Sequence, residues 1–215
     1  MKIGFVGLGK MGLNMVTRLV QGGHEVVAFA RTAATVDEAV KIGAVGAHSL
    51  KEVVAQLKTP RVVWVMVPSG ETTEKVIEEL STLLSEGDVI IDGGNSNYHD
   101  TKARALRLAK KNIRFVDSGT SGGVWGLKVG YCLMVGGDKA TIAMIEPILK
   151  TLAPPDGYLH TGPSGAGHYV KMIHNGIEYG MMQAYAEGFE ILKASEYDLD
   201  LAGIANLWNR GSVVR

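Results

Sequence analysis

The sequence predicts an α/β protein. A mostly parallel, Rossmann-type sheet with helices on both faces is followed by the start of an all-helical second domain. Three observations indicate this fold class. Short apolar runs alternate with helical patterns, a glycine-rich turn follows the first run, and the strand signal stops near Gly165. Runs that are apolar throughout are typical of parallel strands covered on both faces.

The individual elements follow from the period of the apolar residues and from the glycines and prolines that end each run. Strands are predicted at Lys2–Val6, Glu25–Ala30, Arg61–Val67, Asp88–Asp92, Arg114–Asp117 and Tyr131–Gly136. Helices are predicted at Met11–Gln21, Thr35–Ile42, Thr72–Leu84, Asp100–Lys111 and Lys139–Leu152.

The pattern changes at Gly165, after which no strand signal is found up to Ala194. That stretch, 165–194, reads as one helix of about 30 residues, about 45 Å long at 1.5 Å per residue. We therefore assign residues 1–163 to a Rossmann dinucleotide-binding domain and residues 164–215 to the beginning of a helical C-terminal domain. Because Leu199–Arg215 reads as a further helical segment without an ending signal, we interpret the chain as part of a longer protein.

Composition and charge exclude several classes of function. Lys and Arg total 22, as do Asp and Glu, so the formal net charge is zero, which argues against a nucleic-acid or membrane-surface partner. Cys132 is the only cysteine, which rules out an internal disulfide and is typical of the reducing cytosol. The N-terminus does not resemble a signal peptide, and no apolar run has the length of a membrane span. A cytoplasmic protein without a metal site is expected.

The first strand ends in Gly7-Leu8-Gly9-Lys10-Met11-Gly12, which opens the first helix. In a dinucleotide site the first glycine makes the tight turn, the second lets the backbone approach the pyrophosphate, and the third lets the helix pack on the strand. Free N–H groups at the helix start then bind the anion. The alternative is a glycine-rich turn that binds nothing. The strand–turn–helix context favours a cofactor site formed by all six residues.

The end of the second strand bears on the choice between NAD and NADP. NAD sites usually place an acidic residue there to bind the ribose 2′-hydroxyl, whereas this sequence has Ala30-Arg31-Thr32. An arginine pairs with a 2′-phosphate that a carboxylate would repel, so NADP is favoured over NAD. The alternative is that Arg31 is a solvated loop residue. Val67-Pro68-Ser69, where another strand ends, are expected to line the cofactor as well.

Two further segments are candidates for substrate binding. Asp92-Gly93-Gly94-Asn95-Ser96 follows the carboxyl end of a strand, where open α/β sheets bind ligands. The run Ser118–Gly123 has small residues and hydroxyls that suit a polyhydroxylated or anionic ligand, although a plain mobile loop is the alternative.

A third candidate lies on the long helix. Lys171, Asn175 and Glu178 share one face of it, with His174 beside them. The alternative is a solvent-facing charged stripe, which is common on helices. Gly165 and Gly167 let this helix begin close to the sheet, which favours a ligand site.

The run from Gly165 to Tyr179, with the sequence Gly-Ala-Gly-His-Tyr-Val-Lys-Met-Ile-His-Asn-Gly-Ile-Glu-Tyr, resembles the signature of the decarboxylating 6-phosphogluconate dehydrogenases. Asp92–Ser96 and Ser121–Gly123 also stand at the family's positions, so the resemblance covers essentially the whole chain. The His-Asn-Gly-Ile-Glu-Tyr run separates this family from the related 3-hydroxyacid dehydrogenases. Those enzymes and a non-catalytic NADP-binding module are the alternative functions.

The resemblance implies oxidation of 6-phosphogluconate at C3 and loss of CO2 to give ribulose 5-phosphate, a step of the pentose phosphate pathway. It implies that Lys171 is the general base for the C3 hydroxyl and that Glu178 is the acid that protonates the enediol carbon. A lysine must be neutral to act as a base, and desolvation in a closed cleft lowers the pKa of a lysine. A homodimer is implied for the full-length protein, and Asn95 is expected to contact both cofactor and substrate. The residues implied to bind substrate are Asn95, Ser121, Gly122, Gly123, His174, Asn175 and Tyr179.

The sequence departs from the family pattern at three places. Ala30 stands where NADP-dependent members usually have Asn, and Val124-Trp125 replace two acidic residues of the longer members. Val124-Trp125 resemble the shorter bacterial branch, some of which prefers NAD. The C-terminal part that grips the substrate phosphate in the family is not in the sequence. We therefore expect residues 1–215 to bind cofactor and to turn over substrate poorly or not at all.

Overall fold

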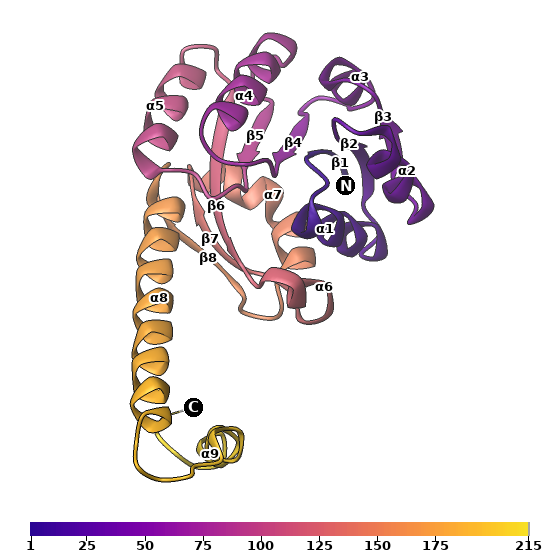
Figure 1. Ribbon diagram of the computed structural model, residues 1–215. Helices are drawn as coiled ribbons and strands as arrows, with labels where there is room; N and C mark the ends of the chain where they lie inside the picture. The colour runs from indigo at the N-terminus through magenta and orange to yellow at the C-terminus, as the bar shows by residue number, and fades with distance from the viewer. Residues whose placement is uncertain (215) are drawn as a thin grey trace. The chain divides into compact units, whose positions relative to one another are not determined.

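The computed structural model describes residues 1–214, and within them the compact unit Met1–Met172 is built on one eight-stranded sheet (Figure 1). The strand order is β3-β2-β1-β4-β5-β6-β7-β8, and β6 and β7 pair antiparallel while the other neighbours pair in parallel. The first six strands have the order of a Rossmann sheet, so the predicted fold class is confirmed. The strands are β1 (Lys2–Val6), β2 (Glu25–Phe29), β3 (Val45–Ala47), β4 (Val62–Val65), β5 (Val89–Asp92), β6 (Arg114–Ser121), β7 (Cys132–Gly136) and β8 (Tyr158–Gly162).

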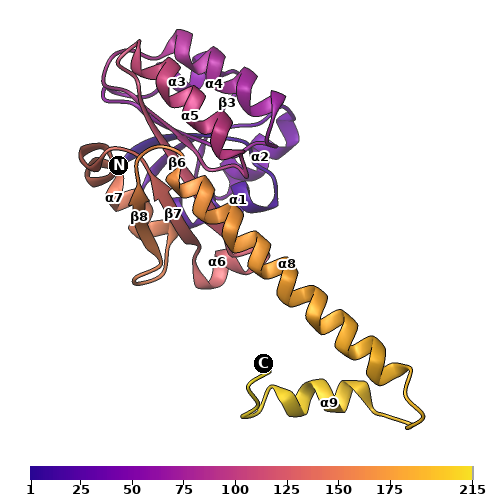
Figure 2. The same cartoon turned by 90° about the vertical axis from the view of Figure 1, so that its left-hand side faces the viewer.

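Helices cover both faces of this sheet. One face packs against α1, α2 and α7, and the other against α3, α4 and α5. Figure 2 shows α3, α4 and α5 together on one side. A short 3-10 turn, η1, and a single helical turn, α6, follow β6. The bounds are α1 (Lys10–Gln21), α2 (Ala33–Lys41), α3 (Leu50–Ala55), α4 (Glu71–Leu83), α5 (Tyr98–Ala109), η1 (Gly123–Trp125), α6 (Gly126–Val129) and α7 (Lys139–Leu152).

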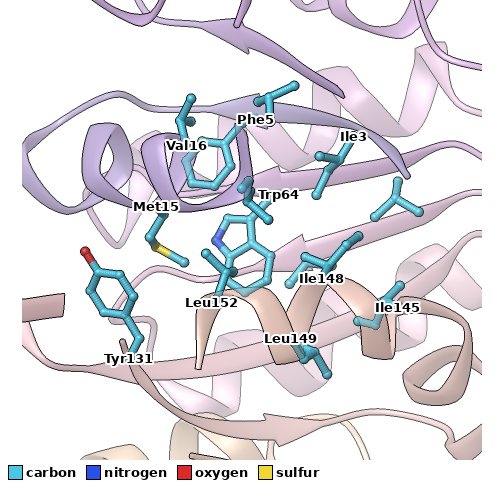
Figure 3. Packing of buried hydrophobic residues seen from close by; sticks show 14 of the residues in the cluster. Ile3, Phe5, Met15, Val16, Trp64, Tyr131, Ile145, Ile148, Leu149 and Leu152 are labelled. Carbon is cyan, nitrogen blue, oxygen red and sulfur yellow. The ribbon is translucent and has the colours of Figure 1, made fainter. Parts of the chain in front are cut away.

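The strands alternate their side chains between two apolar cores, as a period of two requires. Phe5 and Trp64, on the neighbouring strands β1 and β4, stack with ring centroids 6.3 Å apart in the core that faces α1 and α7 (Figure 3). Ile90 of β5 points to the opposite core, under α3, α4 and α5. Asp92, two residues further along β5, therefore faces the same side as Ile90, which matters for the site described below.

The sequence reading missed five short elements, β3, α3, η1, α6 and β8, and set several bounds wrongly. β3 has only three residues, and α3 has six, so neither gives a clear period. β8 is a partly exposed edge strand, so it lacks the continuous apolar run of the inner strands. Strand β6 continues to Ser121, beyond the predicted end at Asp117, because pairing with β7 supports its small residues. Helix α2 begins at Ala33, earlier than the predicted Thr35.

The second compact unit is Ile173–Arg215. Helix α8 (Ala166–Lys193) runs into it and confirms the predicted long helix to within one residue at each end. Helix α9 (Leu201–Trp208) forms in the segment predicted as helical, with the Asp200 side chain accepting a hydrogen bond from the Gly203 N–H at 2.9 Å. Contrary to the sequence reading, this helix does end, and Gly211 follows with a φ of +85°.

Two further sequence predictions concern the domain boundary and membrane-spanning segments. The boundary between residues 163 and 164 stays a prediction, and Arg215 lies outside the described residues. Among residues 1–214, the helices include none that combines the length and the apolar character needed to cross a membrane.

Buried His24 should make stability depend on pH. Its Nε2–H donates to Thr151 Oγ1 at 2.9 Å, because the Thr151 hydroxyl itself donates to the Pro147 carbonyl. Burial lowers the pKa of His24, and the positive N-terminus lowers it further. A histidine with a lowered pKa in the folded state binds its proton more tightly when unfolded. Stability should therefore fall as the pH drops below about 6.5, the ordinary histidine value.

Thermal unfolding measured at pH 7.5 and pH 5.5 tests this prediction. A His24→Gln variant keeps an N–H donor for Thr151 without the titration, so its midpoint should fall less between the two pH values than that of the parent protein. An equal fall in both proteins would contradict the prediction.

Candidate active site

A cavity of about 350 Å³ lies at the carboxyl ends of β1, β2 and β4. The strand order reverses between β1 and β4, and this is where doubly wound sheets bind dinucleotides. Predicted cofactor residues that line the cavity are Gly7, Leu8, Gly9, Ala30, Arg31, Thr32, Val67 and Pro68. The sequence reading missed six further lining residues, Val6, Phe29, Thr35, Met66, Thr72 and Val76. Thr35 could have been found, because it follows Thr32 by one helical turn.

The three motif glycines meet the steric demands expected of a dinucleotide turn. Gly7 has a φ of +102°, and a Cβ there would lie 2.2 Å from the Met66 carbonyl oxygen. A Cβ on Gly12 would lie 2.0 Å from the Gly7 carbonyl oxygen, so helix and strand pack at backbone contact. Gly9 differs, because a Cβ on it would meet nothing within 4 Å. Its backbone borders open space at the start of α1, where a pyrophosphate would need to approach.

Five other predicted cofactor residues do not line this cavity. Lys10, Met11 and Gly12 belong to the first turn of α1, while Ser69 and Asn95 lie on the loops after β4 and β5. A larger cavity of about 760 Å³ lies between α7 and β8, and no predicted site residue lines it. We assign the site to the smaller cavity because it sits at the carboxyl ends of the parallel strands. Within residues 1–214, no group of three His, Cys, Asp or Glu side chains could hold a metal ion.

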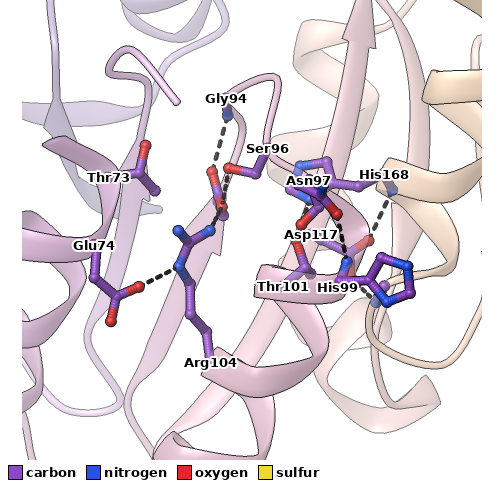
Figure 4. Close-up of polar contacts among 12 residues, drawn as sticks. Thr73, Glu74, Gly94, Ser96, Asn97, His99, Thr101, Arg104, Asp117 and His168 are labelled. Atoms are coloured by element: carbon purple, nitrogen blue, oxygen red, sulfur yellow. Dashed lines mark hydrogen bonds and ion pairs between the residues drawn. The ribbon is translucent and has the colours of Figure 1, made fainter. Parts of the chain in front are cut away.

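The loop after β5 is held by the buried carboxylate of Asp92. Its Oδ1 accepts a hydrogen bond from the Gly94 N–H at 3.1 Å, and its Oδ2 accepts one from Ser96 Oγ at 2.7 Å (Figure 4). Gly94 and Ser96 are buried, whereas Asn95 between them is exposed. The loop therefore presents the Asn95 side chain from a backbone that is fixed on both sides.

Asp117, the neighbour of Asp92 on β6, holds the start of α8. The two residues are in register on adjacent strands, so their side chains face the same side of the sheet. Asp117 Oδ1 accepts from the Gly165 N–H at 2.7 Å, and Oδ2 accepts from the His168 N–H at 2.9 Å (Figure 4). A carboxylate at this position satisfies free N–H groups and complements the positive end of the helix dipole.

His168 links the start of α8 to α5. Its Nδ1 lies 2.7 Å from Thr101 Oγ1, and the Thr101 hydroxyl donates to the Asn97 carbonyl oxygen at 3.1 Å. Because that hydroxyl proton is already used, the histidine Nδ1–H is the donor in the first bond. Asn97 is the residue before α5, and its side chain accepts from the His99 N–H. The β5–α5 loop is thereby connected to the helix that carries Lys171.

Lys171 lies against β6, and its side chain is 8% exposed. A Cβ on Gly119 would lie 2.4 Å from the Lys171 Cβ. Only a glycine at position 119 therefore lets the aliphatic part of the Lys171 side chain pack against the backbone of β6. Ser121 is two residues further along β6, and Gly122 and Gly123 follow with φ angles of +136° and +49°. The structure therefore brings Lys171 to the strand that leads into the Ser121–Gly123 loop.

Four predicted substrate or catalytic residues lie on the part of α8 that belongs to the second unit. His174 Nδ1 lies 3.7 Å from Glu178 Oε2 and 3.3 Å from Asn175 Oδ1. Tyr179 is 69% exposed. Their binding of a substrate stays a prediction.

The Asp117 carboxylate should contribute strongly to stability. An Asp117→Ala variant loses two hydrogen bonds at the start of α8 and leaves buried N–H groups without partners, which should cost about 2 to 4 kcal/mol. Asp37→Ala, on the exposed side of α2, is the control and should change stability by less than about 0.5 kcal/mol. Urea unfolding measures both values. Equal effects of the two substitutions would show that Asp117 does not anchor the helix.

Two family sequence models match the chain. The NAD binding domain of 6-phosphogluconate dehydrogenase matches residues 2–162, and the C-terminal domain of 6-phosphogluconate dehydrogenase matches residues 167–196. The chain is 44% identical to the NAD(+)-dependent, decarboxylating 6-phosphogluconate dehydrogenase of Haloferax volcanii, over 100% of this chain and 71% of that protein. It is also 44% identical to the decarboxylating enzyme of Schizosaccharomyces pombe, over 98% of this chain but only 45% of that protein.

Solved structures agree with the sequence matches. The chain superposes on 6-phosphogluconate dehydrogenase from Plasmodium falciparum with a TM-score of 0.90 and 32% identity, over 98% of this chain and 48% of the other. The sheet order, the dinucleotide turn and these matches lead to one conclusion. The chain belongs to the 6-phosphogluconate dehydrogenase family.

Proposed function

We propose that the protein catalyses the oxidative decarboxylation of 6-phosphogluconate to ribulose 5-phosphate and CO2, with hydride transfer to NADP or NAD, of which NADP is favoured. The observation that carries this proposal is the placement of Lys171. It is buried against Gly119 of β6, on a helix whose start is anchored at the carboxyl end of the sheet by Asp117. A basic side chain held in that position, beside a loop of small residues, suits the removal of a hydroxyl proton from a bound sugar acid.

The reaction follows from the roles that the family resemblance gives to Lys171 and Glu178. Neutral Lys171 takes the C3 hydroxyl proton, and a nicotinamide bound at the carboxyl ends of β1, β2 and β4 would supply the hydride acceptor for C3. Lys171 then returns a proton to the C3 keto oxygen while the bond between C2 and the carboxylate carbon breaks and CO2 leaves. The electron pair of that bond forms the enediol. Glu178 then protonates C2 while Lys171 takes the proton back from the C3 oxygen, which gives the ketose. The substrate would be held by Asn95, Ser121, Gly122, Gly123, His174, Asn175 and Tyr179.

The cofactor preference rests on the residues at the end of β2. Arg31, Thr32 and Thr35 line the cavity and offer one positive charge and two hydroxyls, with no carboxylate among its lining residues. Such a set suits a 2′-phosphate. Named relatives use either cofactor, since the Haloferax enzyme is NAD(+)-dependent and the Plasmodium enzyme was solved with NADP+. The homodimer and the cytoplasmic location stay predictions from the resemblance and the composition.

The proposed base can be tested on the natural protein by following cofactor reduction at 340 nm with 6-phosphogluconate. Lys171→Met should lower kcat by about a thousandfold, within the usual range for loss of a general base, while the cofactor dissociation constant stays unchanged. Lys193→Met, on an exposed part of the same helix, is the matched control and should keep the parent rate.

Other outcomes of this assay would replace the proposal. Turnover of a 3-hydroxyacid in place of 6-phosphogluconate would assign the protein to the related dehydrogenases. Cofactor binding without turnover of either substrate would indicate a non-catalytic NADP-binding module.

The proposed role of Arg31 predicts a change in selectivity. Arg31→Ala should weaken NADP binding by about 10- to 100-fold, the usual effect of losing a charge-assisted hydrogen bond, and should leave NAD binding nearly unchanged. Lys41→Ala, at the far end of α2, is the control. Calorimetric titration with both cofactors measures the ratio. An equal loss of affinity for NAD and NADP would exclude a contact between Arg31 and the 2′-phosphate.

A further inference from the structure

A chain of charged side chains connects the supports of two loops, Val67–Ser69 after β4 and Gly93–Ser96 after β5. Arg104 of α5 is only 2% exposed and lies between two carboxylates. Its Nε donates to Glu74 Oε2 of α4 at 2.8 Å, and one terminal nitrogen lies 3.4 Å from Asp92 Oδ2 at the end of β5 (Figure 4). Arg107 also pairs with Glu74, at the exposed end of the chain.

Asp92 and Thr73, the neighbour of Glu74 on α4, hold two different loops. Asp92 binds the Gly94 N–H and the Ser96 hydroxyl, which fixes the loop after β5. Thr73, next to Glu74 on α4, donates from its hydroxyl to the Pro68 carbonyl oxygen at 2.9 Å, which fixes the loop after β4. The two loops are in contact, because a Cβ on Gly94 would lie 3.1 Å from the Val67 carbonyl oxygen. A single arginine therefore connects the supports of both loops.

The charges of the chain balance one another. Asp92 is fully buried, and burying a carboxylate costs free energy unless it is hydrogen-bonded and paired with an opposite charge. Burial alone would raise the pKa of Glu74, but the hydrogen bonds from Arg104 and Arg107 outweigh it and lower that pKa. Glu74 is thus ionised at neutral pH, and Arg104 is attracted to α4 and to β5 at once. Such an arrangement restrains the spacing between the two loops.

We propose that Arg104 is a positioning residue that sets the spacing between the Val67–Ser69 loop and the Gly93–Ser96 loop, and with it the placement of Asn95 and the nicotinamide for hydride transfer. This inference rests on the proposed function for the identity of the substrate. Arg104 acts through Asp92 and Glu74. The contacts proposed for the pyrophosphate and the 2′-phosphate belong instead to the turn after β1 and to the end of β2. Turnover should therefore depend on Arg104 much more than cofactor affinity does.

The decisive comparison is between Arg104→Met and Arg107→Met in the natural protein. Both substitutions remove one arginine partner of Glu74, but only the first breaks the link to Asp92. Arg104→Met should lower kcat by about 10- to 100-fold, the loss expected from misplacing reacting groups by about 1 Å. The cofactor dissociation constant should stay within about twofold, because the turn after β1 and the end of β2, which are proposed to hold the phosphates, are not among the groups that Arg104 contacts. Arg107→Met should leave both quantities unchanged.

A second readout does not depend on turnover. The amide of Gly94 is bonded to Asp92, so its hydrogen exchange reports on the loop directly. Exchange at Gly94 should rise by at least about tenfold in Arg104→Met and should not change in Arg107→Met. If the parent protein fails to oxidise 6-phosphogluconate, the proposed function is wrong. The exchange rates then decide alone whether Arg104 holds the loop.

Two results would overturn the proposal. One is a kcat for Arg104→Met within about twofold of the parent value, and the other is an unchanged exchange rate at Gly94. If Arg104→Met does not fold because Asp92 is left as an unpaired buried charge, the double variant Asp92→Asn/Arg104→Met removes both charges. It should fold and still show the lowered kcat with near-normal cofactor affinity. Parent-like turnover in the folded double variant would also overturn the proposal.

Discussion

The hydrogen bonds from the Gly165 and His168 N–H groups to the Asp117 carboxylate are the constraint on which the site depends. They join the first turn of α8 to the middle of β6, at the residue where its parallel pairing with β5 ends, and so transfer the rigidity of the sheet to the helix. Lys171 lies on the next turn of that helix. Its position is therefore set by a buried carboxylate on β6 and not by a flexible loop, as the general-base role proposed for it would require.

Close packing makes this constraint effective. A Cβ on Gly167 would lie 2.4 Å from the Met134 carbonyl oxygen, and one on Gly119 would lie equally close to the Lys171 Cβ. Helix and strands therefore meet at backbone distance, which larger residues would prevent. The same principle applies at the dinucleotide turn, where Gly12 brings α1 against the Gly7 carbonyl. In both places glycine serves a specific contact, and the ligand-facing groups follow from it.

Asp92 and Asp117 form a pair of supports on neighbouring strands, and their negative charges are compensated in different ways. The Asp117 carboxylate is stabilised by hydrogen bonds from backbone N–H groups at a helix start. The Asp92 carboxylate is stabilised by Arg104 together with a backbone N–H and a hydroxyl. One support carries the helix with Lys171, and the other carries the loop with Asn95. Because the two carboxylates are in register, the proposed substrate and cofactor groups share one rigid edge of the sheet.

Local pattern alone determined the Rossmann class, the glycine turn and the long helix, because apolar period and glycine position are properties of neighbouring residues. It also identified Arg31, shortly after β2, as a residue of the cavity, and the family signature around Lys171. The local pattern could not predict which distant segments pair with one another. The antiparallel contact that extends β6 to Ser121, the edge strand β8, and the Asp92–Arg104–Glu74 chain join residues distant in sequence. Only the tertiary structure decides them, since the energy of a buried charge depends on which distant group folds against it.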